Sequence, residues 1–120
     1  MKFMLLMIPN VYQPGSNPTS DFTPDPQKME EMGRFNEELG KRSKITDLNG
    51  LQPQLNGARV AFNKGHATVT DGPSIESKEV LGGYWMIEAD SKEAVVEMMQ
   101  QCPAEDGDII EIRQIFEFEE

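Results

Sequence analysis

Cysteine, histidine and basic residues are all scarce in this sequence. One cysteine, Cys102, excludes a disulfide within the chain and favours a reducing compartment, so we expect a cytoplasmic protein. No activating motif surrounds Cys102, which favours a small apolar role over a nucleophile. The 11 Lys and Arg residues against 21 Asp and Glu give a net charge of −10. General nucleic-acid binding needs a cationic face, so we expect no nucleic-acid partner.

Long apolar runs are missing as well. The longest run covers residues 3–8 and is ended by Pro9. A membrane-spanning helix needs about 20 apolar residues, so we expect no membrane partner. The length of 120 residues suits a single domain over residues 1–120.

Apolar and turn-forming residues alternate in blocks that predict strands. The run from Lys2 to Ile8 is apolar at consecutive positions, which is typical of a strand buried on both faces. Asn63-Lys64-Gly65 is a turn signal between two short runs. The predicted strands cover residues 2–8, 58–62, 67–70, 84–89 and 109–118.

Two helices are predicted from their caps and apolar spacing. Asp25 can cap the first helix and Pro26 suits its first position. Its apolar stripe consists of Met29, Met32, Phe35 (or Asn36) and Leu39. Asp90 and Glu93 match a capping box for the second helix, which Pro103 ends. The core positions of that helix are Ala94, Val95, Met98, Met99 and Cys102.

Two stretches are predicted to lack regular structure. Residues 9–25 are rich in proline and form a long loop that Tyr12 and Phe22 could fix in place. Leu48, Leu51 and Leu55 lie in a connector that contains Pro, Asn and Gly.

The element order β-α-β-β-β-α-β predicts an α+β fold. If the runs 58–62 and 67–70 form one bent hairpin, the order approximates a ferredoxin-like antiparallel sheet. Two helices cover only one face of such a sheet, yet its first strand is apolar on both faces. A second copy, packed sheet against sheet, would cover the other face, so we expect a homodimer.

A cluster of carboxylates follows the third strand. Asp71-Gly72-Pro73 has the composition of a turn, and Asp71 is also a candidate base or hydrogen-bond acceptor. Glu76 and Glu79 could join it in binding a ligand. Their spacing matches no established metal loop, so we expect no metal and no cofactor.

Further candidates come from residues that could face a cavity between two sheets. Tyr84 and Trp85 point to opposite sides of their strand, so one is core and the other can line the cavity. Arg113 and Glu111 share a face, where they can pair or Arg113 can meet a ligand carboxylate. His66, in a hairpin turn, is a weaker catalytic candidate.

Several blocks resemble the DGPF-type branch of the YCII-related family. They are Asp71-Gly72-Pro73, Glu76, Lys78-Glu79, Leu81-Gly82-Gly83-Tyr84 and Ile110-Glu111-Ile112-Arg113, with weaker similarity at Met1 to Leu6 and Leu51-Gln52-Pro53. The resemblance spans nearly the whole chain. It implies a dimeric α+β barrel built from ferredoxin-like halves, and it assigns no activity.

Two features depart from the family pattern. Ser74 stands where the motif has an aromatic residue, which removes an apolar wall. The first helix has no histidine, so the His/Asp acid–base pair of the wider group is not matched. The resemblance therefore does not decide whether the chain is an enzyme.

Three functions fit these residues. The first is a homodimeric small-ligand-binding or regulatory module that uses Asp71, Glu76, Tyr84 and Arg113. The second is a cofactor-independent isomerase, lyase or oxygenase with Asp71 as the acid/base and His66 or Arg113 assisting. The third is an accessory module whose acidic surface binds basic protein partners.

Overall fold

The computed structural model describes residues 1–12, 23–72 and 80–118. Its strands and helices, in chain order, are β1 (Lys2–Ile8), α1 (Pro26–Arg42), β2 (Lys44–Gly50), β3 (Ala58–Asn63), β4 (His66–Asp71), β5 (Gly83–Glu88), α2 (Lys92–Met99) and β6 (Ile109–Gln114). Two short 3-10 turns, η1 (Asn10–Tyr12) and η2 (Gln54–Asn56), lie in the connections.

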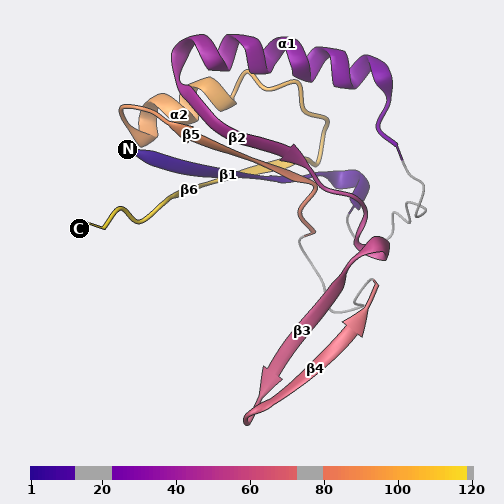
Figure 1. Ribbon diagram of the computed structural model, residues 1–120. Helices are drawn as coiled ribbons and strands as arrows, with labels where there is room; N and C mark the ends of the chain where they lie inside the picture. Colours follow the sequence, from indigo (N-terminus) through magenta and orange to yellow (C-terminus); the bar gives the residue numbers. More distant parts are fainter. Residues whose placement is uncertain (13–22, 73–79, 119–120) are drawn as a thin grey trace.

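Four of the strands form one antiparallel sheet, in the order β2-β5-β1-β6. Both helices lie on the same side of this sheet (Figure 1). Within the sheet and its helices the chain follows a βαββαβ course, which is the ferredoxin-like plan. The predicted α+β fold class is therefore confirmed.

The second strand of this plan is not the predicted one. The sequence predicts a connector around Leu48, and this is wrong because Leu48 belongs to β2, opposite Trp85. Asp, Asn and Gly, which are depleted in strands, make up three of the last four residues of β2. The runs predicted as strands 58–62 and 67–70 do pair as a hairpin, but outside the four-stranded sheet.

The last strand is shorter than predicted. β6 ends at Gln114 rather than at residue 118, because β1 begins at Lys2 and offers no further backbone to pair with. The Ile115 amide donates the last hydrogen bond, to the Lys2 carbonyl at 2.8 Å. Beyond it, the rings of Phe116 and Phe118 stack on each other in an exposed segment.

Alternate residues of the two central strands point toward the helices and form the core. Phe3 and Leu5 of β1 are fully buried, and Trp85 of β5 is only 3% exposed. The indole Nε1 of Trp85 donates a hydrogen bond to Asn36 Oδ1 on α1 at 2.8 Å, which satisfies its polar atom. The helices complete the core with Leu39, Val95, Met98 and Met99.

Helix α1 begins as the sequence predicts. Asp25 Oδ1 accepts a hydrogen bond from the Gln27 amide at 2.9 Å, and Pro26 occupies the first helical position. Met29, the first residue of the predicted apolar stripe, is 58% exposed and does not pack in the core. Helix α1 is about 25 Å long, longer than strands that span about 20–23 Å. The stripe residues that do pack in the core are Met32, Phe35 and Leu39.

Helix α2 begins one residue later than the predicted cap. Ser91, not Asp90, is the N-cap, and its Oγ accepts a hydrogen bond from the Ala94 amide at 3.1 Å. Ser91 has the extended backbone that a cap residue adopts, with φ −159° and ψ 160°. The helix ends at Met99, ahead of Pro103.

Among the residues that the structure describes, strands β3 and β4 pair only with each other. Lys64 and Gly65 both have positive φ, 51° and 81°, which is the signature of a type I′ hairpin turn. The hairpin extends away from the domain on the side of the sheet that the helices do not occupy (Figure 1). The predicted turn at residues 63–65 is thus confirmed.

The backbone approaches closely where β5 begins, at the glycine pair Gly82-Gly83. A Cβ on Gly82 would lie 2.4 Å from Pro9 Cγ, and one on Gly83 would lie 3.0 Å from the Asn49 carbonyl oxygen. Nearby, the Tyr12 hydroxyl donates to the Leu51 carbonyl at 2.8 Å. Phe22 and the rest of residues 13–22 lie outside the described residues.

Candidate functional site

The side of the sheet opposite the helices carries two cross-strand rows of side chains. Residues directly opposite each other in an antiparallel sheet point to the same side. The rows are Asn49, Tyr84, Leu6 and Glu111, and beside them Asp47, Met86, Met4 and Arg113. We call these two rows the uncovered face. Its centre, on β1 and β5, is half-buried and mostly apolar, whereas both edges are polar.

A β-bulge turns Asp47 onto the uncovered face. Ile45 lies opposite Ile87 and Asp47 lies opposite Met86, so Thr46 is an extra residue in β2. The Thr46 hydroxyl donates to the Met86 carbonyl at 3.0 Å and thereby anchors the bulge. Without the extra residue, strand alternation would point Asp47 toward the helices.

Asp47 and its neighbours form a compact hydrogen-bond network. The Tyr84 hydroxyl donates to Asp47 Oδ2 at 2.8 Å. Asn49 Nδ2 donates both to Asp47 Oδ1 at 3.1 Å and to the Tyr84 hydroxyl oxygen at 3.0 Å. The Leu48 amide also donates to Asp47 Oδ1, at 2.9 Å. These bonds fix the orientation of a carboxylate and a phenol at the edge of an apolar surface.

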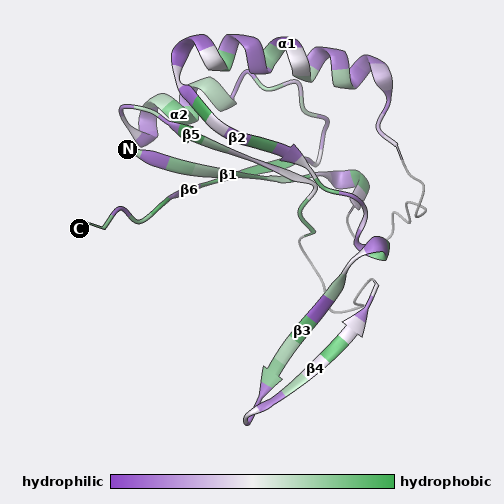
Figure 2. Ribbon diagram, viewed as in Figure 1, coloured by the Kyte–Doolittle hydropathy of each residue, from purple (hydrophilic) through white to green (hydrophobic). Residues whose placement is uncertain are grey.

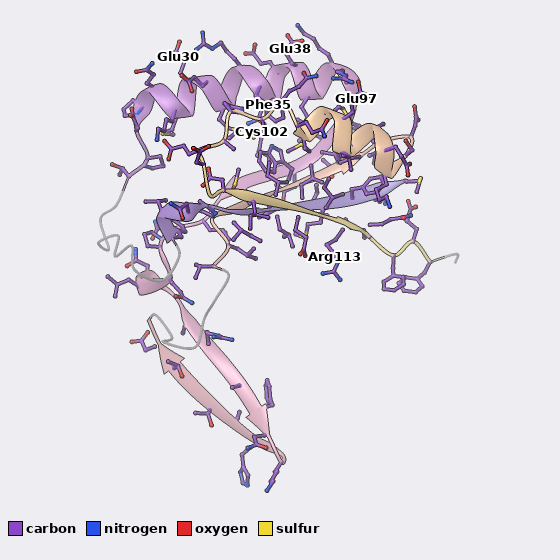
Figure 3. All side chains as sticks on the ribbon, turned by 180° about the vertical axis from the view of Figure 1, so that it is seen from behind. Glu30, Phe35, Glu38, Glu97, Cys102 and Arg113 are labelled. Atoms are coloured by element: carbon purple, nitrogen blue, oxygen red, sulfur yellow. The ribbon has the colours of Figure 1, made fainter. Side chains whose placement is uncertain are left out.

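Arg113 stands at the opposite edge of the uncovered face. Its Nη1 lies 3.4 Å from Glu111 Oε2, and the side chains are 70% and 45% exposed. An exposed pair at this distance adds little stability. It engages one of the five guanidinium N–H donors, so Arg113 can also meet a ligand carboxylate. Figure 3 shows Arg113 on the side of the sheet away from the helices.

The spacing of the strands sets the size of the site. Tyr84 and Glu111 flank Leu6, one strand away on each side. Strand neighbours lie about 4.8 Å apart, so Tyr84 and Glu111 are separated by about 10 Å, and the two polar edge strands β2 and β6 by about 14 Å. The uncovered face can therefore contact a small organic molecule with an apolar body and a polar group at each end.

Two of the predicted site residues lie on the hairpin instead. Asp71 is the last residue of β4, opposite Ala58, and His66 is the first, opposite Asn63; both are exposed. Among the described residues, no hydrogen bond or ion pair joins either of them to Tyr84, whose hydroxyl bonds to Asp47 and Asn49. Within one protomer the structure brings Tyr84 and Arg113 to one face and leaves Asp71 and His66 off it.

The turn after Asp71 has the predicted backbone. Gly72 has φ 77°, a conformation that favours glycine, and its amide donates to the Gly57 carbonyl at 2.7 Å. This bond closes the base of the hairpin. Glu76, and Ser74 with it, lie outside the described residues.

Cys102 is a packed side chain rather than a reactive one. It lies between the helices and the sheet (Figure 3), with its Sγ 3.9 Å from Met32 Sδ. Burial, and to a smaller degree the nearby Asp108 charge, raise the pKa of the Cys102 thiol to about 11. The thiolate that a nucleophile needs is therefore suppressed at neutral pH.

Residues 1–12, 23–72 and 80–118 form neither a metal-binding cluster nor a membrane-spanning helix. These residues hold no group of three His, Cys, Asp or Glu side chains placed to bind a metal ion. Neither of their helices has the length and apolar character that crossing a membrane requires.

Asp47 and Asn49 were not among the sequence candidates. The pattern Ile45-Thr46-Asp47-Leu48 places apolar residues three apart, which is not the alternation of a regular strand. The bulge produces this spacing, and a bulge is recognised only once the partner strand is known. The available signals were the single tyrosine of the predicted strand, Tyr84, and the Asp-x-Asn segment at residues 47–49.

A family model describes almost the whole chain. The model of the YCII-related domain matches residues 1–119. No curated protein matches the sequence at a significant level.

Proposed function

The chain belongs to the YCII-related domain family, and we propose that it is a homodimeric module that binds a small organic ligand between two sheets. The observation that carries this proposal is the Asp47–Tyr84–Asn49 network beside the apolar centre of the uncovered face. Oriented polar groups at the rim of an apolar surface are the usual composition of a small-molecule site.

The apolar centre supports the second copy. Met4, Leu6 and Met86 lie on the side of the sheet that neither helix occupies. A sheet with a second apolar face gains stability when another layer covers it. A two-fold axis would let the same surface of another protomer provide that layer, and the two faces would enclose a cavity.

The two polar edges define the ligand. Asp47 and Tyr84 can hydrogen-bond a hydroxyl or amine of the ligand, and Arg113 can pair with a carboxylate. An apolar or aromatic body would lie over Leu6 between them. We therefore propose a small organic acid that also carries a hydroxyl or amine group.

The test combines a ligand screen with two conservative variants. A panel of aromatic and aliphatic carboxylates bearing hydroxyl or amine groups is screened by thermal shift and then by calorimetry. Tyr84→Phe and Asp47→Asn should each weaken the best binder about tenfold, because the first removes a hydroxyl and the second removes a charged acceptor oxygen, a change worth about 1–1.5 kcal/mol in each case. Lys41→Ala, on the exposed surface of α1, is the matched control and should leave affinity unchanged.

Two results would contradict the proposal. One is a panel with no binder for the wild-type protein. The other is a binder whose affinity neither Tyr84→Phe nor Asp47→Asn changes, which would place the ligand elsewhere on the molecule. Sedimentation of the wild-type protein tests the homodimer separately.

A further inference from the structure

The β3–β4 hairpin has one apolar face and one polar face. Its register places Val60 opposite Val69 and Phe62 opposite Ala67, so these side chains lie on one side, with the pair Ala58–Asp71 at its base. The other side carries the pairs Arg59–Thr70, Ala61–Thr68 and Asn63–His66. Alternation of this kind is what a strand shows when one of its faces is packed and the other meets water.

The apolar face of the hairpin is exposed within the protomer. Val60 is 54% exposed, Val69 is 66% exposed and Phe62 is 79% exposed. Figure 2 shows hydrophobic positions along both strands, well away from the core. A two-stranded ribbon by itself is marginally stable in water. The residue pattern therefore fits a hairpin whose apolar face packs against another molecule.

The charge of the hairpin differs from that of the chain as a whole. Residues 58–71 contain two basic side chains, Arg59 and Lys64, against one acidic side chain, Asp71. The whole chain has a net charge of −10. A weakly basic, apolar arm is attracted to an acidic surface, and a second copy of this chain supplies one.

The direction of the hairpin also indicates a second copy. It extends on the side of the sheet away from the helices, which is the side of the uncovered face (Figures 1 and 3). A protomer seated on the uncovered face would lie alongside the hairpin. The interface of the proposed dimer would then continue from the sheet onto the arm.

We propose that the hairpin is a dimerisation arm that packs the face formed by Val60, Phe62, Ala67 and Val69 against a second copy of the chain. The proposal rests on the homodimer of the proposed function. It adds a second contact region to each protomer, outside the sheet. Two-fold symmetry makes the contact reciprocal, so each copy is held by the arm of the other.

The experiment compares two charged substitutions on opposite faces of the hairpin. Sedimentation equilibrium gives the dimer dissociation constant of the wild-type protein, of Phe62→Asp and of Thr68→Asp. Phe62→Asp should raise the dissociation constant at least about tenfold, since it places a charge in the contact. Thr68→Asp adds the same charge to the polar face and should change the constant by less than about threefold. Circular dichroism verifies that both variants keep the fold.

A third variant, Leu6→Asp, separates the arm from the uncovered face. If Leu6→Asp dissociates the dimer and Phe62→Asp does not, the arm is overturned and the sheet-to-sheet dimer stands. If Phe62→Asp and Thr68→Asp weaken the dimer equally, the effect is one of charge and the apolar contact is also overturned. A wild-type protein that stays monomeric over a 100-fold range of concentration overturns both the homodimer and the arm.

Discussion

The four-stranded sheet and the hairpin use similar strands but bury them very differently. Phe3 on β1 is fully buried, whereas Phe62 on β3 is 79% exposed. Each has an apolar residue directly opposite, Ile87 for Phe3 and Ala67 for Phe62. The local pattern is alike in the two regions, so the difference comes from what covers them. Helices α1 and α2 lie over the sheet, and neither lies over the hairpin (Figure 1).

This contrast shows that an apolar strand face indicates a contact without identifying it. In the sheet, the contact is made within the chain by Leu39, Val95 and Met98. In the hairpin neither helix makes it, and the same holds for the uncovered face of the sheet; we propose that a second copy makes both contacts. Both surfaces lie on the side away from the helices, which is why one partner can cover the two together.

The largest predicted effect compares the two phenylalanines. Phe3→Ala should lower the free energy of unfolding by about 3–5 kcal/mol, because it leaves a cavity in the core. Phe62→Ala should change the unfolding of dilute protein by no more than about 0.5 kcal/mol. Its effect should grow with protein concentration as dimers form. Urea unfolding of both variants, followed at several concentrations, provides the measurement. An equal cost for the two variants in dilute protein would mean that the hairpin packs on its own domain.

A smaller effect compares one glycine from each region. Gly82→Ala should cost about 1–3 kcal/mol, because its Cβ would lie 2.4 Å from the Pro9 ring. The backbone cannot yield easily there, since Gly82 bonds both to Met7 and to Leu51. A Cβ on Gly65 would meet open space, but an alanine held at the φ of 81° would be strained by about 1–2 kcal/mol.

The two glycine variants should differ in where the strain is felt. Gly82→Ala should lower the urea midpoint of the whole domain. Gly65→Ala should reduce hydrogen-exchange protection only at amides of β3 and β4, because the hairpin unfolds without disturbing the core. A loss of global stability on Gly65→Ala that matches that of Gly82→Ala would contradict the separation of the two regions.

The fold was predictable where local signals and partners coincide. The cap at Asp25, the strand β1 and the turn at Lys64-Gly65 each have a signal within a few residues, and all three are confirmed, although β1 is fully buried on only one of its faces. The ferredoxin-like plan follows from the order of such elements. β2 was not predicted, because a bulge disrupts its alternation and its polar residues are typical of a connector.

The candidate site was predicted in part for the same reason. Tyr84 and Arg113 belong to strands with regular alternation, so their common face follows once the strands pair. Asp47 reaches that face only through the extra residue in β2. Asp71 was favoured for its motif, yet a motif does not reveal that its strand leaves the sheet.

The smallest predicted effect tests the start of α2, where the sequence and the structure name different caps. Ser91→Ala should cost about 1 kcal/mol in the free energy of unfolding, because the Ala94 amide loses its acceptor. This helix supplies Val95 and Met98 to the core, so the cost is felt by the sheet domain rather than by the hairpin. Asp90→Ala should stay within about 0.5 kcal/mol. Urea unfolding of the two variants distinguishes the caps, and a larger loss for Asp90→Ala would assign the cap to Asp90 after all.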